Sequence, residues 1–324
     1  MQYGNMDNSP RSGYPAANLA GSDVCFIDLS CQQALSAYCL SMMAGKLGKT
    51  SDEDEFASEH AELNRLVNNY HWCGRKGFYY DVFGRHSPDV RHNFLGAKTA
   101  AAFWPILSGT AAQEQINALL EHLLSPDEFW TRHPVPSLSK DDPNYDPMGG
   151  YWLGGVWAPT NYMIAAGLKK RGWNSVSRDL AAKHLDGMAE VMKDKSYGSI
   201  WECYSPDHSR PSNKYEKGEL VRNNFVGWSG LGPIAMLIEN ILAFSFDAPS
   251  NTIHWEIADP GVHGLRKLLF NGRTVSLICG RSASPGRREI HIETSKPVIV
   301  SITMAGREGE LTNTMKAGKQ ELHI

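Results

Sequence analysis

The chain has 324 residues, of which 42% are hydrophobic and 21% charged, and its formal net charge is −3. This composition is ordinary for a globular protein, and the length exceeds what one hydrophobic core usually fills, so we expect one large domain and one small one. The near-neutral charge gives no electrostatic reason to expect nucleic acid or a membrane as partner, and no apolar run is long enough to span a membrane.

Helical periodicity dominates the first three quarters of the chain. Apolar residues at helical spacing predict helices over seven ranges: 29–46, 53–71, 94–107, 111–124, 159–171, 174–194 and 230–245. The helix over 174–194 is the clearest, because Leu180, Leu185 and Met188 share one face. Loops rich in Gly, Pro and Trp separate the helices, and such loops on a helical scaffold commonly carry function.

The pattern changes near residues 246–252. Beyond them, short segments rich in Val, Ile and Thr predict antiparallel strands at 253–257, 263–269, 274–279, 288–293 and 297–303. We therefore expect a helical domain over 1–246 and a small antiparallel β domain over 247–324. Pairs of helices joined by long loops indicate an α/α toroid for the first domain.

The cysteine and aspartate residues do not occur at spacings typical of metal sites. The six cysteines form no CxxC pair, so we expect mostly buried thiols, with a disulfide between two of them as the alternative. Asp141, Asp142 and Asp146 do not match a calcium-binding loop and indicate a solvated acidic loop instead. We predict no metal and no cofactor. The polar residues 1–22 contain no visible secretory signal, and the compartment is left open.

Two carboxylates stand in distinctive surroundings. Asp7 lies in a predicted tight turn, four residues before Arg11, and Glu202 is flanked by Trp201 and Tyr204. Each has a purely structural alternative: Asp7 as an Asx-turn or helix-capping residue, and Glu202 as a hydrogen-bonded carboxylate in the core.

Aromatic side chains beside glycine mark two further stretches. Residues 149–162 combine four glycines with Tyr151, Trp152 and Trp157, and residues 227–233 contain Trp228 between glycines. Glycine permits backbone conformations that can arrange these rings around a cavity, where the flat face of Trp can stack on a sugar. The alternative is a tight structural loop whose rings fill core space.

A pair of carboxylates in unlike environments is what glycoside hydrolysis requires, because one must donate a proton while the other stays ionised. The local surroundings do not assign the two roles. Aromatic neighbours would raise the pKa of Glu202 and a nearby arginine would lower that of Asp7, which is the reverse of the assignment given below.

Five segments resemble the trehalase-like and family 63 glycoside hydrolases, which include mannosylglycerate hydrolases. The sequence Asp7-Asn-Ser-Pro-Arg11 resembles their general-acid signature, and Ile200-Trp-Glu-Cys-Tyr204 resembles the segment with the general base. The remaining three are Phe26-Ile-Asp-Leu29, Gly77-Phe-Tyr-Tyr-Asp81 and the Trp152 to Pro159 region. They occur in the same order as in the family, over about residues 1–246.

The resemblance implies an (α/α)6 toroid that hydrolyses an α-glycoside with inversion of configuration. Asp7 would be the general acid and Glu202 the general base. The expected substrate, an oligosaccharide or small glycoside, would be bound by Arg11, Tyr151, Trp152, Trp157, Trp201 and Trp228. Its sugar stays open among glucosides, mannosides such as mannosylglycerate, and trehalose-like disaccharides.

The sequence departs from the family pattern in three places. Leu153 stands where many relatives have Arg, and residues 2–5 differ from the usual stretch before the acid. Asp7 also comes early, and the seven predicted helices fall short of a complete barrel. We therefore expect a toroid that is incomplete at its N-terminal side, with an open flank through which the chain would associate.

Two other functions remain open at this point. A polysaccharide lyase or sugar epimerase also uses an α/α toroid, but it needs a Tyr or His base near a cation, and the sequence contains no such cluster. A carbohydrate-binding or catalytically inactive remnant would keep the aromatic residues and lose turnover.

Overall fold

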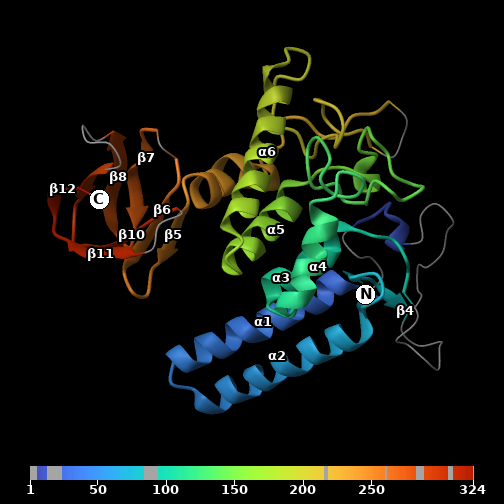
Figure 1. Cartoon of the computed structure of the whole chain (residues 1–324), viewed down its shortest axis with the longest axis horizontal. Helices are drawn as coiled ribbons and strands as arrows, with labels where there is room; N and C mark the ends of the chain where they lie inside the picture. Colours follow the sequence, from blue (N-terminus) through green and yellow to red (C-terminus); the bar gives the residue numbers. More distant parts are fainter. Residues whose placement is uncertain are drawn as a thin grey trace. The chain divides into compact units, whose positions relative to one another are not determined.

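The computed structural model describes residues 6–12, 24–83, 94–214, 218–259, 261–281, 288–305 and 309–323. The chain divides into two compact units, Met1–Pro233 and Ile234–Ile324 (Figure 1). The first unit is mainly helical and the second is built from β-strands. This agrees with the expected order of a helical domain followed by a β domain.

Six α-helices form the frame of the first unit: α1 (Ile27–Lys46), α2 (Thr50–Tyr70), α3 (Trp104–Ser108), α4 (Gln113–Leu123), α5 (Ala158–Lys170) and α6 (Asn174–Lys193). Helix α1 packs along α2, helix α5 packs along α6, and α3 contacts both α1 and α5 (Figure 1). Short strand pairs lie beside them, β1 (Val24–Cys25) with β4 (Val82–Phe83) and β2 (Trp72–Cys73) with β3 (Phe78–Tyr79).

Two predicted helices differ from those observed. The range 94–107 begins extended and becomes helical only in the 3-10 turn η3 (Ala100–Phe103), which leads into α3. Thr99 is held extended by a β-bridge to Leu138, and Gly109, at φ 88, ends the helix. The range 230–245 contains the 3-10 turn η5 (Trp228–Leu231) and the π-helix η6 (Gly232–Ile241), after which the chain turns into a strand.

Eight strands form two four-stranded sheets in the second unit: β5 (Phe244–Asp247), β6 (Thr252–Ile257), β7 (His263–Phe270), β8 (Arg273–Arg281), β9 (Arg288–Thr294), β10 (Val298–Met304), β11 (Glu310–Met315) and β12 (Gly318–His323). Their orders are β11-β10-β6-β5 and β12-β9-β8-β7. Side chains from both sheets, among them Trp255 and Leu277, form one buried cluster, so the unit is a sandwich.

The sequence predicts an antiparallel β unit, but one of its strand pairs is parallel. Strand β10 pairs in parallel with β6, while every other strand pair within the two sheets is antiparallel. The chain leaves β6 to build β7, β8 and β9 in the other sheet and returns as β10, and this crossover permits a parallel neighbour. The second unit also begins at Ile234, earlier than the expected change at 246–252, because Ile238 and Leu242 pack against the core of the sandwich.

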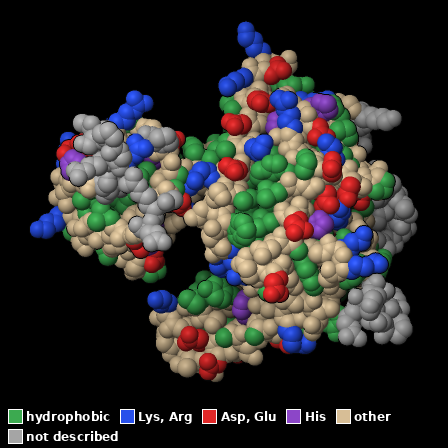
Figure 2. Space-filling view, in the orientation of Figure 1, with side chains coloured by type: hydrophobic (Ala, Val, Ile, Leu, Met, Phe, Trp, Pro, Cys, Tyr) green, Lys and Arg blue, Asp and Glu red, His purple; other side chains and the backbone are tan. Residues whose placement is uncertain are grey.

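The cysteines are all free thiols. Cys31, Cys203 and Cys279 are buried, whereas Cys25 and Cys39 are exposed. Within the residues described, no helix is long and apolar enough to cross a membrane. On the face drawn in Figure 2, acidic and basic side chains of the helical unit are interspersed rather than gathered by sign.

A buried ion cluster fixes the N-terminal turn to the start of α1. The guanidinium of Arg11 is fully buried and donates to Asp81 through Nε and Nη2, at 2.7 and 2.8 Å. It also donates to Asp28 through Nη1 and Nη2, at 3.0 and 2.7 Å, and Nη1 contacts the sulfur of Met6 at 3.6 Å. These contacts use all five N–H donors of the side chain.

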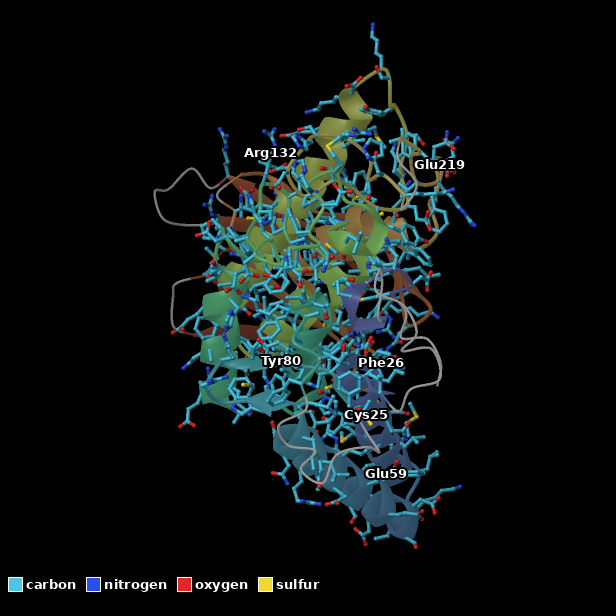
Figure 3. The ribbon with its side chains drawn as sticks, turned by 90° about the vertical axis from the view of Figure 1, so that its right-hand side faces the viewer. Cys25, Phe26, Glu59, Tyr80, Arg132 and Glu219 are labelled. Carbon is cyan, nitrogen blue, oxygen red and sulfur yellow. The ribbon has the colours of Figure 1, made fainter. Side chains whose placement is uncertain are left out.

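The surroundings of this cluster explain why it stays charged in the core. Burial alone would lower the pKa of Arg11, but the opposing charges of Asp81 and Asp28 raise it above its usual range. Asp81 also accepts the backbone N–H of Ile27 at 2.8 Å, in the first turn of α1, where Phe26 provides no side-chain cap. The Phe26 ring, labelled in Figure 3, lies 4.7 Å from the guanidinium carbon of Arg11.

A second buried polar group joins α5 to α6. Asn161 donates to the carbonyl of Pro134 and to Nδ1 of His184, both at 2.8 Å, and accepts the N–H of Val135 at 3.0 Å. Because the amide donates to it, the Nδ1 of His184 must be unprotonated. Burial, and to a smaller extent His133, lowers the pKa of His184 from its ordinary 6.5 to about 4.

Replacing Asp28 by Asn should lower the free energy of unfolding by about 3–5 kcal/mol, because it removes one partner of a buried charge. Urea titrations monitored by circular dichroism would measure the change. The matched control is Asp52→Asn, which breaks an exposed pair with Lys49 and should leave stability nearly unchanged. Equal stability of the two variants would show that the Arg11 cluster does not hold the fold.

His184 should make the helical unit sensitive to acid. The neutral ring is favoured in the fold, so its contribution is fully present above pH 6.5 and is lost as the pH falls towards 4, by about 3 kcal/mol. Stability curves of the wild type and His184→Asn should converge over this range, whereas those of the exposed-residue control His208→Asn should run parallel to the wild type. Parallel curves for His184→Asn would contradict the assignment.

Candidate active site

The turn that carries Asp7 is tied to the glycine-rich loop by its neighbour. Asp7 is exposed, and the side chain of Asn8 beside it is buried. The amide of Asn8 donates to the carbonyl of Gly150 at 2.8 Å and accepts the backbone N–H of Trp152 at 2.9 Å. These two bonds span Tyr151, so Asn8 fixes the acid turn directly beside that residue.

The glycine-rich loop places Tyr151 in an unusual backbone conformation. Tyr151 has φ 64, a left-handed value that favours glycine, and its N–H donates to the carbonyl of Asn213 at 2.8 Å. Gly149, at φ 102, precedes it, and a Cβ there would lie 2.1 Å from Oγ of Ser212. A strained residue held by surrounding contacts is typical of a functional position.

Glu202 is buried and enclosed by hydrogen-bond donors. Its Oε1 accepts the hydroxyl of Tyr151 at 3.2 Å, and its Oε2 accepts the N–H of Arg222 at 3.4 Å. Its own carbonyl accepts the indole N–H of Trp228 and the hydroxyl of Ser229, each at 3.2 Å. The position of this carboxylate is therefore fixed by both its side chain and its backbone.

Four loop segments lie side by side beneath these residues. Isolated β-bridges join Pro136 to Val156, Val156 to Tyr204, and Tyr204 to Pro211. These bridges place the glycine-rich loop next to the segment that contains Glu202, although the two are far apart in the sequence.

Tyr151 connects the two carboxylates. Burial first, then the negative charge of Glu202 and, more weakly, that of Asp7, raises the pKa of the Tyr151 hydroxyl well above its usual range. The hydroxyl therefore stays protonated and acts as a donor. The hydroxyl of Tyr151 contacts Glu202, and the bonds of Asn8 on both sides of Tyr151 place the turn with Asp7 beside the same residue.

The aromatic residues divide into a buried support and an accessible part. The rings of Trp152 and Trp157 stack at 4.0 Å with an angle of 7° between their planes, and Tyr151 packs edge-on against Trp157. Trp157 is 1% exposed and Trp201 is 7% exposed. Both rings are largely enclosed by protein, and the substrate contact expected for each stays a prediction.

Trp228 has the most exposed indole among the tryptophans of the site. It is 42% exposed, and its ring lies 5.9 Å from that of Trp157. Tyr151 is partly exposed, whereas Trp152 is buried with 9% of its area exposed. Trp228 and Tyr151 are therefore more exposed than Trp152, Trp157 and Trp201.

Arg11, for which a substrate contact is expected, has its side chain enclosed in the core. All five of its N–H donors are used by Asp28, Asp81 and Met6, and its side chain is 0% exposed. The substrate contact stays a prediction, while the observed bonds tie the turn that contains Asp7 to Asp28 and Asp81. The charge of Arg11 is matched by the two aspartates, which removes the sequence-based reason to treat it as the ionic partner of Asp7.

The role of Asn8 is not predicted from the sequence, although Asn8 follows Asp7 directly. Nor are the roles of Asp28 and Asp81 as partners of Arg11, although both fall within the segments that resemble the family. Each of these polar residues stands inside or beside a recognisable motif, which was the available signal. Its hydrogen-bond partner, however, comes from a segment distant in sequence.

A separate cavity of about 600 Å³ lies in the helical unit, bordered among others by Tyr80, Lys98, His122 and Asp141. Its lining residues do not include Asp7 or Glu202. Lys98 forms ion pairs with Glu128 and Asp141 there. The carboxylate of Asp141 is thus used within the loop, in line with a structural rather than a calcium-binding role.

Sequence comparisons identify relatives of the chain. A family model described as the mannosylglycerate hydrolase MGH1-like glycoside hydrolase domain matches residues 3–220. An uncharacterized protein of Borreliella burgdorferi is 27% identical over 298 residues, covering 90% of this chain and 60% of that protein. A mannosylglycerate hydrolase of Selaginella moellendorffii is 29% identical over 170 residues, covering 52% of this chain and 31% of that enzyme. The chain spans at most three fifths of these relatives.

Solved structures share the fold. The GH63 mannosylglycerate hydrolase of Thermus thermophilus in complex with Tris matches with a TM-score of 0.51 and 23% identity, covering 64% of this chain and 44% of that one. Neutral trehalase of Saccharomyces cerevisiae matches with a TM-score of 0.54 and 18% identity, covering 70% and 40%.

The family model covers most of the chain, and the structural matches are to GH63 and trehalase enzymes, so the resemblance inferred from the sequence is confirmed. The chain belongs to the MGH1-like glycoside hydrolase domain family.

Proposed function

We propose that this protein hydrolyses a small α-glycoside with inversion, using Asp7 as general acid and Glu202 as general base. The observation that carries the proposal is the position of Tyr151, which donates to Glu202 and whose neighbours Gly150 and Trp152 are both bonded by Asn8, the residue after Asp7. Asp7 is exposed and Glu202 is buried, and the roles proposed for them follow from the family resemblance.

Asp7 would protonate the glycosidic oxygen as the bond to the leaving group breaks. Its exposure suits contact with a substrate that enters from solvent, and the Asn8 clamp limits the movement of the turn that carries it. The nearby cation Arg11 is paired with Asp28 and Asp81.

Glu202 would accept a proton from the attacking water. The Tyr151 hydroxyl and the Arg222 N–H occupy one lone pair on each oxygen and leave the others for water. Inversion needs space for this water, so the carboxyl groups should be about 6.5–9.5 Å apart during the reaction. The tyrosine would keep the carboxylate oriented while it acts as base.

The substrate class follows from the relatives and the aromatic surface. Enzymes named mannosylglycerate hydrolase, glucosylglycerate hydrolase and trehalase are among the relatives. We propose a glycoside of one or two small units, with the sugar on the exposed face of Trp228. Leu153, in place of the Arg of many relatives, would remove one polar contact to the substrate.

We also propose that the helices form part of an (α/α)6 toroid. Helices α1 and α2, and again α5 and α6, are consecutive, joined by short connections and packed along each other, as toroid pairs are. The similarity to GH63 and trehalase structures supports this arrangement.

Glu202→Gln should lower kcat by at least about 100-fold while α-mannosylglycerate still binds, because the amide keeps the shape and cannot accept a proton. Turnover and calorimetric binding would be measured on the same preparation. Glu219→Gln, an exposed carboxylate in the neighbouring loop (labelled in Figure 3), is the control and should retain the wild-type rate. A Glu202→Gln protein with a near-normal rate would refute the assignment, and a wild type that binds without turnover would favour the inactive remnant.

Asp7→Asn should show a different dependence on substrate. Hydrolysis of a glycoside with a poor leaving group should fall by about 100-fold or more, whereas an α-glycosyl fluoride should be affected least, since fluoride leaves without protonation. The exposed control Asp127→Asn should leave both rates unchanged. An equal loss on both substrates would show that Asp7 is not the acid.

A further inference from the structure

The pattern glutamate, aliphatic residue, histidine occurs on two adjacent strands of the β unit. Strand β9 contains Glu289-Ile290-His291, and strand β12 contains Glu321-Leu322-His323. The middle residues face the other way: Ile290 is fully buried in the sandwich core, and Leu322 packs against that core. Since side chains alternate along a strand, the Glu and His of each pattern lie on the outer face of the sheet.

The strand register brings the two patterns into a square. Strands β9 and β12 are antiparallel, with His291 opposite Glu321 and Glu289 opposite His323. Directly paired residues have Cβ atoms about 4.5–5.5 Å apart. Each glutamate therefore stands beside a histidine of the neighbouring strand, and the four side chains share one face.

The donor atoms of three of these residues already converge. Single ligand atoms of Glu289, His291 and Glu321 all lie within 4.8 Å of one another. Nδ1 of His291 is 3.1 Å from the Glu321 carboxylate, and its Nε2 is 3.7 Å from that of Glu289.

The strands around this group leave room for a ligand. A cavity of about 500 Å³ on the same sheet is lined by His291 and Glu321, together with Arg266, Ser276, Ile278 and Lys319. Gly280 lies opposite Glu289 on β8, and a Cβ there would already be 3.5 Å from Nε2 of His291. The absence of a side chain at Gly280 keeps one side of the imidazole open.

We propose that Glu289, His291 and Glu321 form a binding site for a divalent transition metal, with zinc as the fitting ion and His323 as the fourth ligand. Zinc takes imidazole nitrogen and carboxylate oxygen in a tetrahedral arrangement. The bound ion would join the edge strand β12 to β9. The alternative is that His291 forms only its ion pairs with Glu321 across the strands and with Glu289 along β9, without a metal, which the following experiment distinguishes.

Zinc binding would be measured by calorimetry on the whole chain in a Cys25→Ser, Cys39→Ser background, which removes the exposed thiols. We expect one saturable site per chain. His291→Ala and Glu321→Gln should each weaken it by about 100-fold or more, since even second-shell changes cost roughly 10–100-fold. Both side chains are exposed, so the variants should fold.

The matched control is His254→Ala. His254 also lies beside a glutamate, with Nδ1 3.9 Å from Glu310, but on the other sheet, and among the described residues it belongs to no group of three potential metal ligands. This variant should bind zinc like its parent. An equal loss in His254→Ala, or unchanged binding in His291→Ala, would overturn the site, as would the absence of saturation below about 1 mM zinc.

Hydrogen exchange provides a readout that nonspecific binding would not move. Strand β12 is at the edge of its sheet and is hydrogen-bonded to β9 alone. Zinc should slow amide exchange over 318–323 in the parent protein and leave it unchanged in His291→Ala. Zinc-independent exchange in the parent would contradict the proposal.

Discussion

The neutralisation of one buried guanidinium determines the geometry of the helical unit around the proposed site. Arg11 cannot lie in the core unless each of its donors has an acceptor, and Asp28 and Asp81 provide most of them from the first turn of α1 and from the segment between β3 and β4. Three segments distant in sequence thus meet at one side chain. The carboxylate of Asp81 also holds the first N–H of α1, so the start of the helix and the turn that contains Asp7 share one anchor.

The site combines a rigid support with a small accessible surface. Buried Trp157, stacked on Trp152, supports Tyr151 from below, and Asn8 holds the backbone on either side of that tyrosine. The left-handed backbone of Tyr151 costs on the order of 1–3 kcal/mol. These contacts stabilise it in that conformation. Preorganisation of this kind keeps a general base oriented without rearrangement during the reaction.

The sequence predicted the elements whose signal is local. The periodicity of 174–194 and the alternation of 288–293 correspond to α6 and β9, and the family motifs identified Asp7 and Glu202 as candidates. It could not predict which side chains are buried. Trp157 and Arg11 are residue types expected to bind the substrate. Tertiary packing instead buries the Trp157 ring in the core and surrounds Arg11 with ion-pair partners. The Glu–His square on β9 and β12 depends on strand register, which the hydrophobic pattern alone does not give.

The stereochemistry of the first-formed sugar tests the account most directly. Proton NMR during hydrolysis of an α-glycoside by the whole chain would record the anomer before mutarotation. In the proposed mechanism a water held by Glu202 attacks from the face opposite the leaving group protonated by Asp7, so the β-anomer should form first. Initial formation of the α-anomer would indicate a covalent glycosyl-enzyme and would contradict the roles proposed for both carboxylates.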